Sequence, residues 1–430
     1  MLGKIFNTFS IKLASAICNL LIAIFVSRYL GAIGKGEQSI VLTTISFILI
    51  FVNIAGGATL VYLTPRFKIS HLIFLSYVWS LFTAIAFYII LYFFNIVERD
   101  FVGHICLLSL INSYAAINSN ILLGKEKVNA SNLVNLAQPL FMLIALFSFF
   151  VFVKKADVIS YIYSLYIAYF LSFLLSILLL KKDKEFAFVQ DSNWKITLYA
   201  MFSFGFFNQL SHITSMLNAR LSYYLLTKYK GADQLGIYSN GVSLTEAVWM
   251  VSGSMAMVQY ARIANSYDKK YAQELTVNLT KISLLISIMI IIPMILLPSE
   301  FYSIIFGKEF VNLNYIMLCL APGVILWNFS LLIGHYFSGT GKFYIEFSAS
   351  SAALIVTLLL SFWAIPIWGF YGAGIISSIS YLFNAIVILY FYKKESGVGF
   401  KKLLPQWEDL KLYVSIFKQL LFNKNKDIRL

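Results

Sequence analysis

The sequence contains little charge and few residues of the kinds that build catalytic or metal sites. Only 12% of its 430 residues are charged, about half the share in a soluble domain. The three cysteines lie in apolar stretches at no metal-ligand spacing, so we interpret them as packing residues. The four histidines are dispersed, and no phosphate-binding Gly-Lys-Ser/Thr loop is present. We therefore expect no cofactor, no metal and no ATP hydrolysis.

Long apolar runs make up most of the chain, which is 60% hydrophobic with a mean hydropathy of +0.80. A bilayer core of about 30 Å needs roughly 20 apolar residues of helix, and stretches of that length recur twelve times. The connections between them are short. We therefore predict an all-α integral membrane protein with about twelve transmembrane helices. The predicted spans lie near 9–30, 38–63, 70–94, 101–123, 131–153, 157–180, 196–227, 235–258, 275–297, 311–337, 343–366 and 369–392.

The formal charge of +14 invites a nucleic-acid partner, but the placement of the basic residues offers another explanation. With the N-terminus in the cytoplasm, 24 of the 33 Lys and Arg fall on the inner side and 8 on the outer side, Lys35 among the latter. Arg220 alone lies within a span. This asymmetry follows the positive-inside rule. We predict that both termini are cytoplasmic, and we expect membrane lipids and no nucleic acid as partners.

A repeat relates the two halves of the chain. The stretch after the first span recurs, without a gap, after the seventh span. Because the copies are six spans apart, both halves insert in the same orientation, related by an axis along the membrane normal. The two copies are Arg28-Tyr29-Leu30-Gly31-Ala32 with Gly36 and Ser39, and Lys228-Tyr229-Lys230-Gly231-Ala232 with Gly236 and Ser239.

The repeat predicts two six-helix bundles that face each other across a cavity. The N-terminal lobe is residues 1–180, and a polar cytoplasmic linker, 181–195, precedes the C-terminal lobe, 196–392. Residues 393–430 form a basic tail in which apolar residues recur at helical spacing. Two interpretations of the tail stay open: an amphipathic helix on the inner leaflet, or a poorly ordered basic segment.

Ionisable residues at membrane depth are costly and commonly line cavities or ion paths. Lys12 begins the first span with Asn19 on the same helical face. Arg220 lies in the seventh span, and Glu246 lies deep in the eighth. Snorkelling to the interface is the alternative for the two basic residues. Arg220 follows the polar series Asn208, His212 and Ser215 on its span.

Arg66 and Arg262 occupy matching inner positions in the two halves. A basic rim at the mouth of a cytoplasmic cavity would attract an anionic headgroup, because a guanidinium binds phosphate bidentately. Anchoring at the inner surface explains these residues equally well.

Several stretches, in order, resemble the bacterial oligosaccharide flippases of the multidrug, oligosaccharidyl-lipid and polysaccharide exporter superfamily. The likeness covers both halves and is firmer in the second. No single stretch is diagnostic; their order is. The stretches are Leu217-Asn218-Ala219-Arg220-Leu221 followed by Gly231-Ala232, Leu235–Ser239, Leu244, Glu246 and Trp249; Phe306-Gly307-Lys308-Glu309-Phe310; Ala321-Pro322-Gly323; Ser338–Lys342; and Ile365-Pro366 with Gly369, Gly372-Ala373 and Ser380-Tyr381.

The chain departs from the family at two positions. Ser222 stands where an acidic residue often follows the Arg-Leu pair, and Ala261 stands where proline is common. The first departure leaves Glu246 as the one deep candidate for coupling to a cation.

The resemblance implies a multidrug-exporter-like fold and a flippase that moves a polyprenyl-diphosphate oligosaccharide from the inner to the outer leaflet by alternating access. It places the chain in the bacterial cytoplasmic (inner) membrane, in surface polysaccharide biosynthesis, with a polysaccharide polymerase and export machinery as further partners. The substrate-binding candidates are Lys12, Asn19, Arg66, Asn208, His212, Arg220 and Arg262, and the coupling-ion candidate is Glu246.

Two alternatives remain. A cation-coupled drug exporter of the same fold would more naturally carry several deep carboxylates, whereas this chain has only Glu246. A membrane glycan polymerase or ligase usually needs a sizeable outer loop, and the longest outer connection here is about a dozen residues, near Pro298–Phe310. We therefore predict a transporter and not an enzyme.

Overall fold

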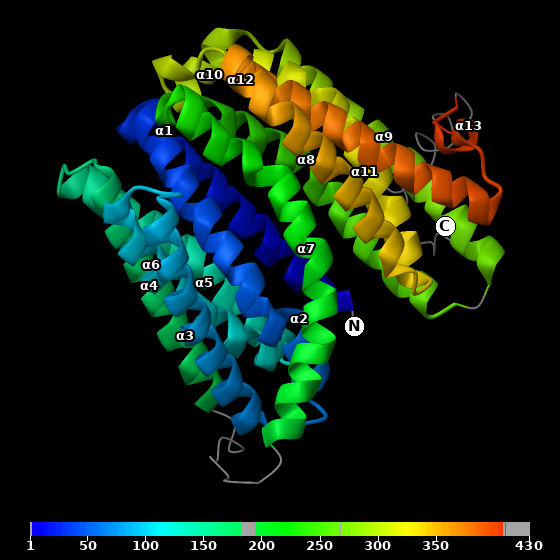
Figure 1. Cartoon of the computed structure of the whole chain (residues 1–430), viewed down its shortest axis with the longest axis horizontal. Helices are drawn as coiled ribbons and strands as arrows, with labels where there is room; N and C mark the ends of the chain where they lie inside the picture. The colour runs from blue at the N-terminus through cyan, green and yellow to red at the C-terminus, as the bar shows by residue number, and fades with distance from the viewer. Residues whose placement is uncertain (1, 182–193, 267, 407–408, 410–430) are drawn as a thin grey trace. The chain divides into compact units, whose positions relative to one another are not determined.

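The computed structural model describes residues 2–181, 194–266, 268–406 and 409, and every regular element among them is helical (Figure 1). The first half comprises α1 (Leu2–Val52), η1 (Asn53–Ala55), α2 (Gly57–Leu63), α3 (Ile69–Phe94), α4 (Arg99–Gly124), α5 (Val128–Phe147), η2 (Ser148–Phe152) and α6 (Val158–Lys181). The second half comprises α7 (Trp194–Lys230), α8 (Ala232–Ala264), α9 (Lys269–Leu296), α10 (Ser299–Phe306), η3 (Lys308–Phe310), α11 (Leu313–Gly339), α12 (Phe343–Ser396) and α13 (Phe400–Leu403).

The helix lengths confirm the predicted all-α fold of about twelve spans. In the described chain, eight helical segments are long and apolar enough to cross a membrane, and the bent helix α8 makes nine. Two of the eight, Ser10–Leu63 and Tyr344–Ser396, are 54 and 53 residues long, more than twice what one crossing needs. Each breaks at a glycine with positive φ, Gly31 or Gly369, so each holds two predicted spans.

By contacts, the chain forms two compact units. The first contains Met1–Gly241, Pro298–Ile316 and Thr357–Ile376. The second contains Val242–Leu297, Met317–Val356 and Ser377–Leu430. These two units are defined by contacts between residues, whereas the two predicted lobes are defined by the sequence repeat. The units therefore do not test the lobe boundaries, which stay a prediction. Most of the predicted linker and the predicted amphipathic part of the tail lie outside the described residues.

In the first unit, α3 to α6 pack beside α1 (Figure 1). Polar side chains join the helices within this apolar packing. The Tyr77 hydroxyl of α3 donates to Asn118 Oδ1 of α4 at 2.9 Å, and Asn118 Nδ2 donates to Ser176 Oγ of α6 at 2.9 Å. Where lipid removes the hydrophobic drive for association, small residues and interhelical hydrogen bonds hold helices together.

The second unit uses the same devices. Gln259 Nε2 of α8 donates to Thr276 Oγ1 of α9 at 2.8 Å and to the Leu332 carbonyl of α11 at 3.0 Å. The start of the tail also packs here: Leu403 is fully buried, and Lys281 Nζ of α9 lies 2.8 Å from Asp409 Oδ2. The first residues of the tail are therefore part of this unit.

The structure buries Lys35, which the sequence analysis places among the outer-side charges. The residue is only 4% exposed, in the half of α1 that follows Gly31. Its ammonium donates to Gln38 Oε1 at 2.8 Å, and Gln38 Nε2 donates to the Tyr161 hydroxyl at 3.1 Å. Among the described residues no carboxylate pairs with it. Sequence position alone did not reveal this burial, since Lys35 sits only four residues beyond a helix break.

The Lys35 network predicts an asymmetric response to substitution. Gln38→Leu should lower the free energy of unfolding by about 2 kcal/mol or more, because it leaves a buried ammonium without an acceptor. Lys35→Met combined with Gln38→Leu should recover part of that loss, since an apolar pair needs no acceptor. Thermal unfolding of the purified chain in detergent measures both effects. A double variant no more stable than Gln38→Leu alone would refute this account.

Candidate functional site

The two copies of the repeat touch each other in the first unit. Ser39 Oγ of α1 donates to Ser239 Oγ of α8 at 2.8 Å, and both residues are buried. These serines occupy equivalent positions in the repeat, 200 residues apart in sequence. A contact between equivalent residues lies on the axis that relates the two copies. The pseudo-twofold axis predicted from the repeat therefore passes between Ser39 and Ser239.

The glycines of the repeat set how closely α1 and α8 approach. A Cβ placed on Gly36 would lie 1.9 Å from the carbonyl oxygen of Ala232. A Cβ placed on Gly236 would lie 1.9 Å from the carbonyl oxygen of Ala32. The contact is reciprocal, and only glycine fits at either position. We call Gly36, Ser39, Gly236 and Ser239 the twofold contact.

Hydrogen bonds flank the twofold contact on both sides. Asn240 Nδ2 of α8 donates to Ser27 Oγ, in the first half of α1, at 2.7 Å. Thr44 Oγ1, in the second half of α1, lies 2.9 Å from the Tyr224 hydroxyl of α7. Both halves of α1 are thus joined to α7 and α8, the two helices that contain the second copy of the repeat. In the predicted topology this junction closes the outer end of the first unit.

The short motif at Phe306–Phe310 has a structural role that the sequence did not reveal. The Glu309 carboxylate accepts a hydrogen bond from the backbone N–H of Ala32, at the break in α1. Gly31 has a φ of 68°, and a Cβ there would lie 2.9 Å from Glu309 Oε2. A carboxylate at a helix start satisfies an orphan N–H and complements the helix dipole. Glu309 therefore fixes the second half of α1.

The predicted substrate residues of the first unit lie on α1, α7 and the segment after α2. Lys12 and Asn19 are exposed on α1, and His212 is exposed on α7. The side chain of Asn208 lies outside the described residues. The exposure is compatible with a polar path, but it does not test one, and these assignments stay predictions.

Arg220 and Arg66 both rest against aromatic rings. Arg220 is half-buried; Nη1 donates to the Tyr223 hydroxyl at 3.1 Å, and the guanidinium lies 5.0 Å from the centre of that ring. Arg66 is exposed at 3.7 Å from the ring centre of Tyr62, which stacks on Phe204 of α7 at 4.7 Å. Arg66 Nη1 also donates to the Tyr62 carbonyl. Stacking on a ring restricts the orientations of a guanidinium.

The remaining predicted residues lie in the second unit. Arg262 is exposed near the end of α8, and Glu246 is partly buried in the same helix. One turn from Glu246, Trp249 packs on Trp327 and Tyr381, with ring centres 5.6 and 5.8 Å away. Coupling through Glu246 stays a prediction.

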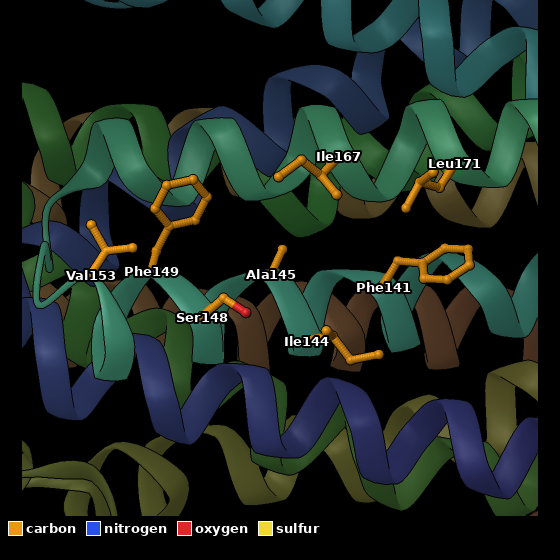
Figure 2. A pocket seen from close by; sticks show the side chains of 8 residues that line it. All are labelled: Phe141, Ile144, Ala145, Ser148, Phe149, Val153, Ile167 and Leu171. Carbon is orange, nitrogen blue, oxygen red and sulfur yellow. The ribbon is translucent and has the colours of Figure 1, made fainter.

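A cavity of about 290 Å³ between α5 and α6 is lined almost wholly by apolar side chains (Figure 2). Ser148, at the start of the π-helical segment η2, is the one polar residue of the lining. This cavity offers no charge to a phosphate group. It is therefore no candidate for the headgroup site, in contrast to the basic residues described above.

The sequence predicts the repeat but not the contact between its copies. Equivalence at an offset of 200 residues shows that two positions share an environment, and it does not show that they meet. The missed signal is the residue type: two glycines and two serines at one helical spacing favour a close crossing of helices.

Residues 1–267 match the protein family described as "Polysaccharide biosynthesis protein". The chain belongs to this family. It is also similar to the "Capsular polysaccharide biosynthesis protein CapF" of Staphylococcus aureus. The identity is 23%, over 91% of this chain and 99% of the relative.

Two solved structures share the fold. One is described as "Lipid II flippase MurJ, inward closed conformation"; it has a TM-score of 0.75 at 17% identity and covers 99% of this chain and 94% of its own. The other is an inward-facing multidrug resistance MATE family transporter of the MOP superfamily, with a TM-score of 0.73 at 13% identity, over 91% of this chain and 98% of its own. The family resemblance and the multidrug-exporter-like fold predicted from the sequence are both confirmed.

The glycines of the twofold contact predict a position-specific effect of one methyl group. In a single-cysteine chain carrying Ser39→Cys, Gly36→Ala should speed labelling by a membrane-impermeant maleimide. The added Cβ would clash with a backbone carbonyl, so closing the junction should cost at least the ~1–3 kcal/mol typical of overpacking. Gly236→Ala should act alike because the contact is reciprocal.

Gly103→Ala is the matched control, since nothing lies within 4 Å of a Cβ at that position of α4. Equal labelling rates in the Gly36→Ala, Gly103→Ala and parent chains would show that the glycines do not govern closure.

Proposed function

We propose that this multi-pass membrane protein is a flippase. It would carry a polyprenyl-diphosphate oligosaccharide from the inner to the outer leaflet of a bacterial cytoplasmic membrane, for surface polysaccharide biosynthesis. Membership of a polysaccharide biosynthesis family and the fold shared with a lipid II flippase support the proposal. The physics is consistent with it, because a sugar diphosphate cannot enter dry hydrocarbon without a prohibitive desolvation penalty. No reaction is assigned to the protein, and a polymerase and export machinery are its proposed partners.

The twofold contact is the observation that carries the proposal. Alternating access needs a junction between the two repeats that can close and reopen around one site. The contact between Ser39 and Ser239 joins equivalent residues through one hydrogen bond and two glycine approaches, with no ion pair among the four residues. Such a junction closes through the close packing of its helices, and it can open without breaking an ion pair.

The substrate would bind through basic residues on the inward path. Arg66 and Arg262 would attract the diphosphate at the inner rim, and Lys12 and Arg220, with the polar groups of Asn19, Asn208 and His212, would hold it within. The membrane potential favours export, because each negative charge moving outward gains about 2.3 kcal/mol per 100 mV. Glu246 is the proposed site for a coupling cation.

Transport of a fluorescent polyprenyl-diphosphate oligosaccharide into the outer leaflet of proteoliposomes tests the function. The wild type should flip the lipid, and Arg220→Ala should lose most of that activity because it removes a charge that holds the diphosphate. Arg220→Lys keeps the charge without the bidentate fork and should fall between the two. Absence of flipping together with cation-driven efflux of dyes would instead identify a drug exporter.

A reversible cross-link tests whether the twofold contact opens during transport. The two Oγ atoms lie 2.8 Å apart, so Ser39→Cys with Ser239→Cys should bring two sulfur atoms into contact and cross-link under oxidation. Cys18, Cys106 and Cys319 are first replaced by serine or alanine.

The oxidised double variant should lose flipping and regain it after reduction, while each single variant should keep its activity under both conditions. Full activity in the cross-linked protein would show that this contact stays closed throughout the cycle and that transport uses another route.

A further inference from the structure

A second cavity, of about 700 Å³, lies in the first unit beside the twofold contact. Its volume falls within the ~300–1,000 Å³ of typical small-molecule sites. It is lined by the end of α3, the turn into α4, the outer end of α7 and the second half of α1. The lining residues that carry charge are Glu37, Glu98, Arg99 and Lys228.

The cavity and the twofold contact share the same helices. Glu37 and Ile40 line the cavity from α1, while their neighbours Gly36 and Ser39 form the twofold contact. Ala232 lines the cavity, and its carbonyl oxygen is the atom that Gly36 approaches closely. Any separation of α1 from α8 would therefore change the wall of this cavity.

The cavity also marks where the two halves differ. At the break at Gly31, the Glu309 carboxylate fills the space and binds the helix start. At the equivalent break, Gly231, φ is again positive, at 96°, and the neighbouring Lys228 and Ala232 face the cavity. A carboxylate also lies beside the second-half break, because a Cβ on Gly231 would lie 2.8 Å from Asp233 Oδ1. The two breaks therefore differ in the cavity that adjoins the second one.

The polar groups of the cavity retain hydrogen-bonding capacity. Within the described chain, the carboxylates of Glu37 and Glu98 have no hydrogen bond or salt bridge. Arg99 is partly committed, since its Nε donates to Asn95 Oδ1 at 2.9 Å. The two carboxylates and two basic groups balance in charge. The carboxylates would repel a diphosphate, and the basic groups would repel a simple cation, so the cavity suits neither ligand.

We propose that this cavity binds the uncharged, hydroxyl-rich part of a saccharide at the outer end of the transport path. Hydroxyl groups donate to carboxylates and accept from ammonium groups, so one sugar ring can use both signs of charge. The rings of Tyr224, Phe94 and Phe101 supply apolar faces for the C–H side of a pyranose. The proposal rests on the flippase function and adds an exit subsite that recognises the glycan and not the diphosphate.

Calorimetric titration of the full chain in nanodiscs tests the subsite. The probe is the carrier-free oligosaccharide released by mild acid from the lipid-linked precursor of the producing cell. The wild type should bind it, and Glu98→Gln and Glu37→Gln should each weaken binding about tenfold, as expected for loss of a charge-assisted hydrogen bond. Glu300→Gln is the control, because Glu300 is an exposed carboxylate of α10 outside the cavity.

Equal affinities in all four proteins would overturn the subsite, as would Glu98-dependent binding of sodium or calcium without saccharide. Flipping measured on the same proteins separates the two proposals. Flipping without Glu98-dependent saccharide binding overturns the subsite alone. Glu98-dependent binding without flipping supports the saccharide site and overturns the flippase function.

Discussion

The closeness of α1 and α8 at Gly36 and Gly236 is the constraint on which the arrangement of the first unit depends. Backbone carbonyls occupy the space that a Cβ would need at these two glycines, so there the helices meet through their main chains. The Ser39–Ser239 hydrogen bond at 2.8 Å can form only because of that approach. The flanking bond from Asn240 to Ser27 requires the same crossing of helices.

Rigidity elsewhere comes from polar groups buried between helices. The Tyr77–Asn118–Ser176 chain and the Gln259 contacts each tie three helices together at fixed positions. In an apolar surrounding these groups have no alternative partner, so sliding one helix would leave donors unsatisfied. In the proposed transport cycle, helices held in this way would move together, and the twofold contact would be where they separate.

Much of the fold could be predicted from hydropathy and the repeat, whereas the contacts could not. Apolar length gave the spans, and the offset between Gly36 and Gly236 gave the symmetry axis. Neither hydropathy nor the repeat shows which residues contact each other. Glu309 belongs to a family-like motif in the sequence, and only the structure shows that it accepts a hydrogen bond from the backbone N–H of Ala32. Lys35 looked like a surface charge because burial depends on α6, which supplies Tyr161 from more than a hundred residues away. The substrate residues stay predictions for the same reason, since polarity within a span predicts a hydrated path without its geometry.

The symmetry of the twofold contact explains how the junction could open and close reversibly, but it does not explain the direction of transport. Because Ser39 and Ser239 are equivalent, opening and closing the contact favours neither half of the chain. Direction in the proposed cycle must come from the gradient acting on the charged headgroup and from differences between the halves. The structure offers one such difference. A carboxylate lies beside each break, Glu309 at Gly31 and Asp233 at Gly231, but the second break also adjoins the cavity lined by Glu37 and Glu98. In the proposed cycle, a glycan bound in this cavity would contact α1 and α8 beside the twofold contact, and its arrival would therefore bias the junction.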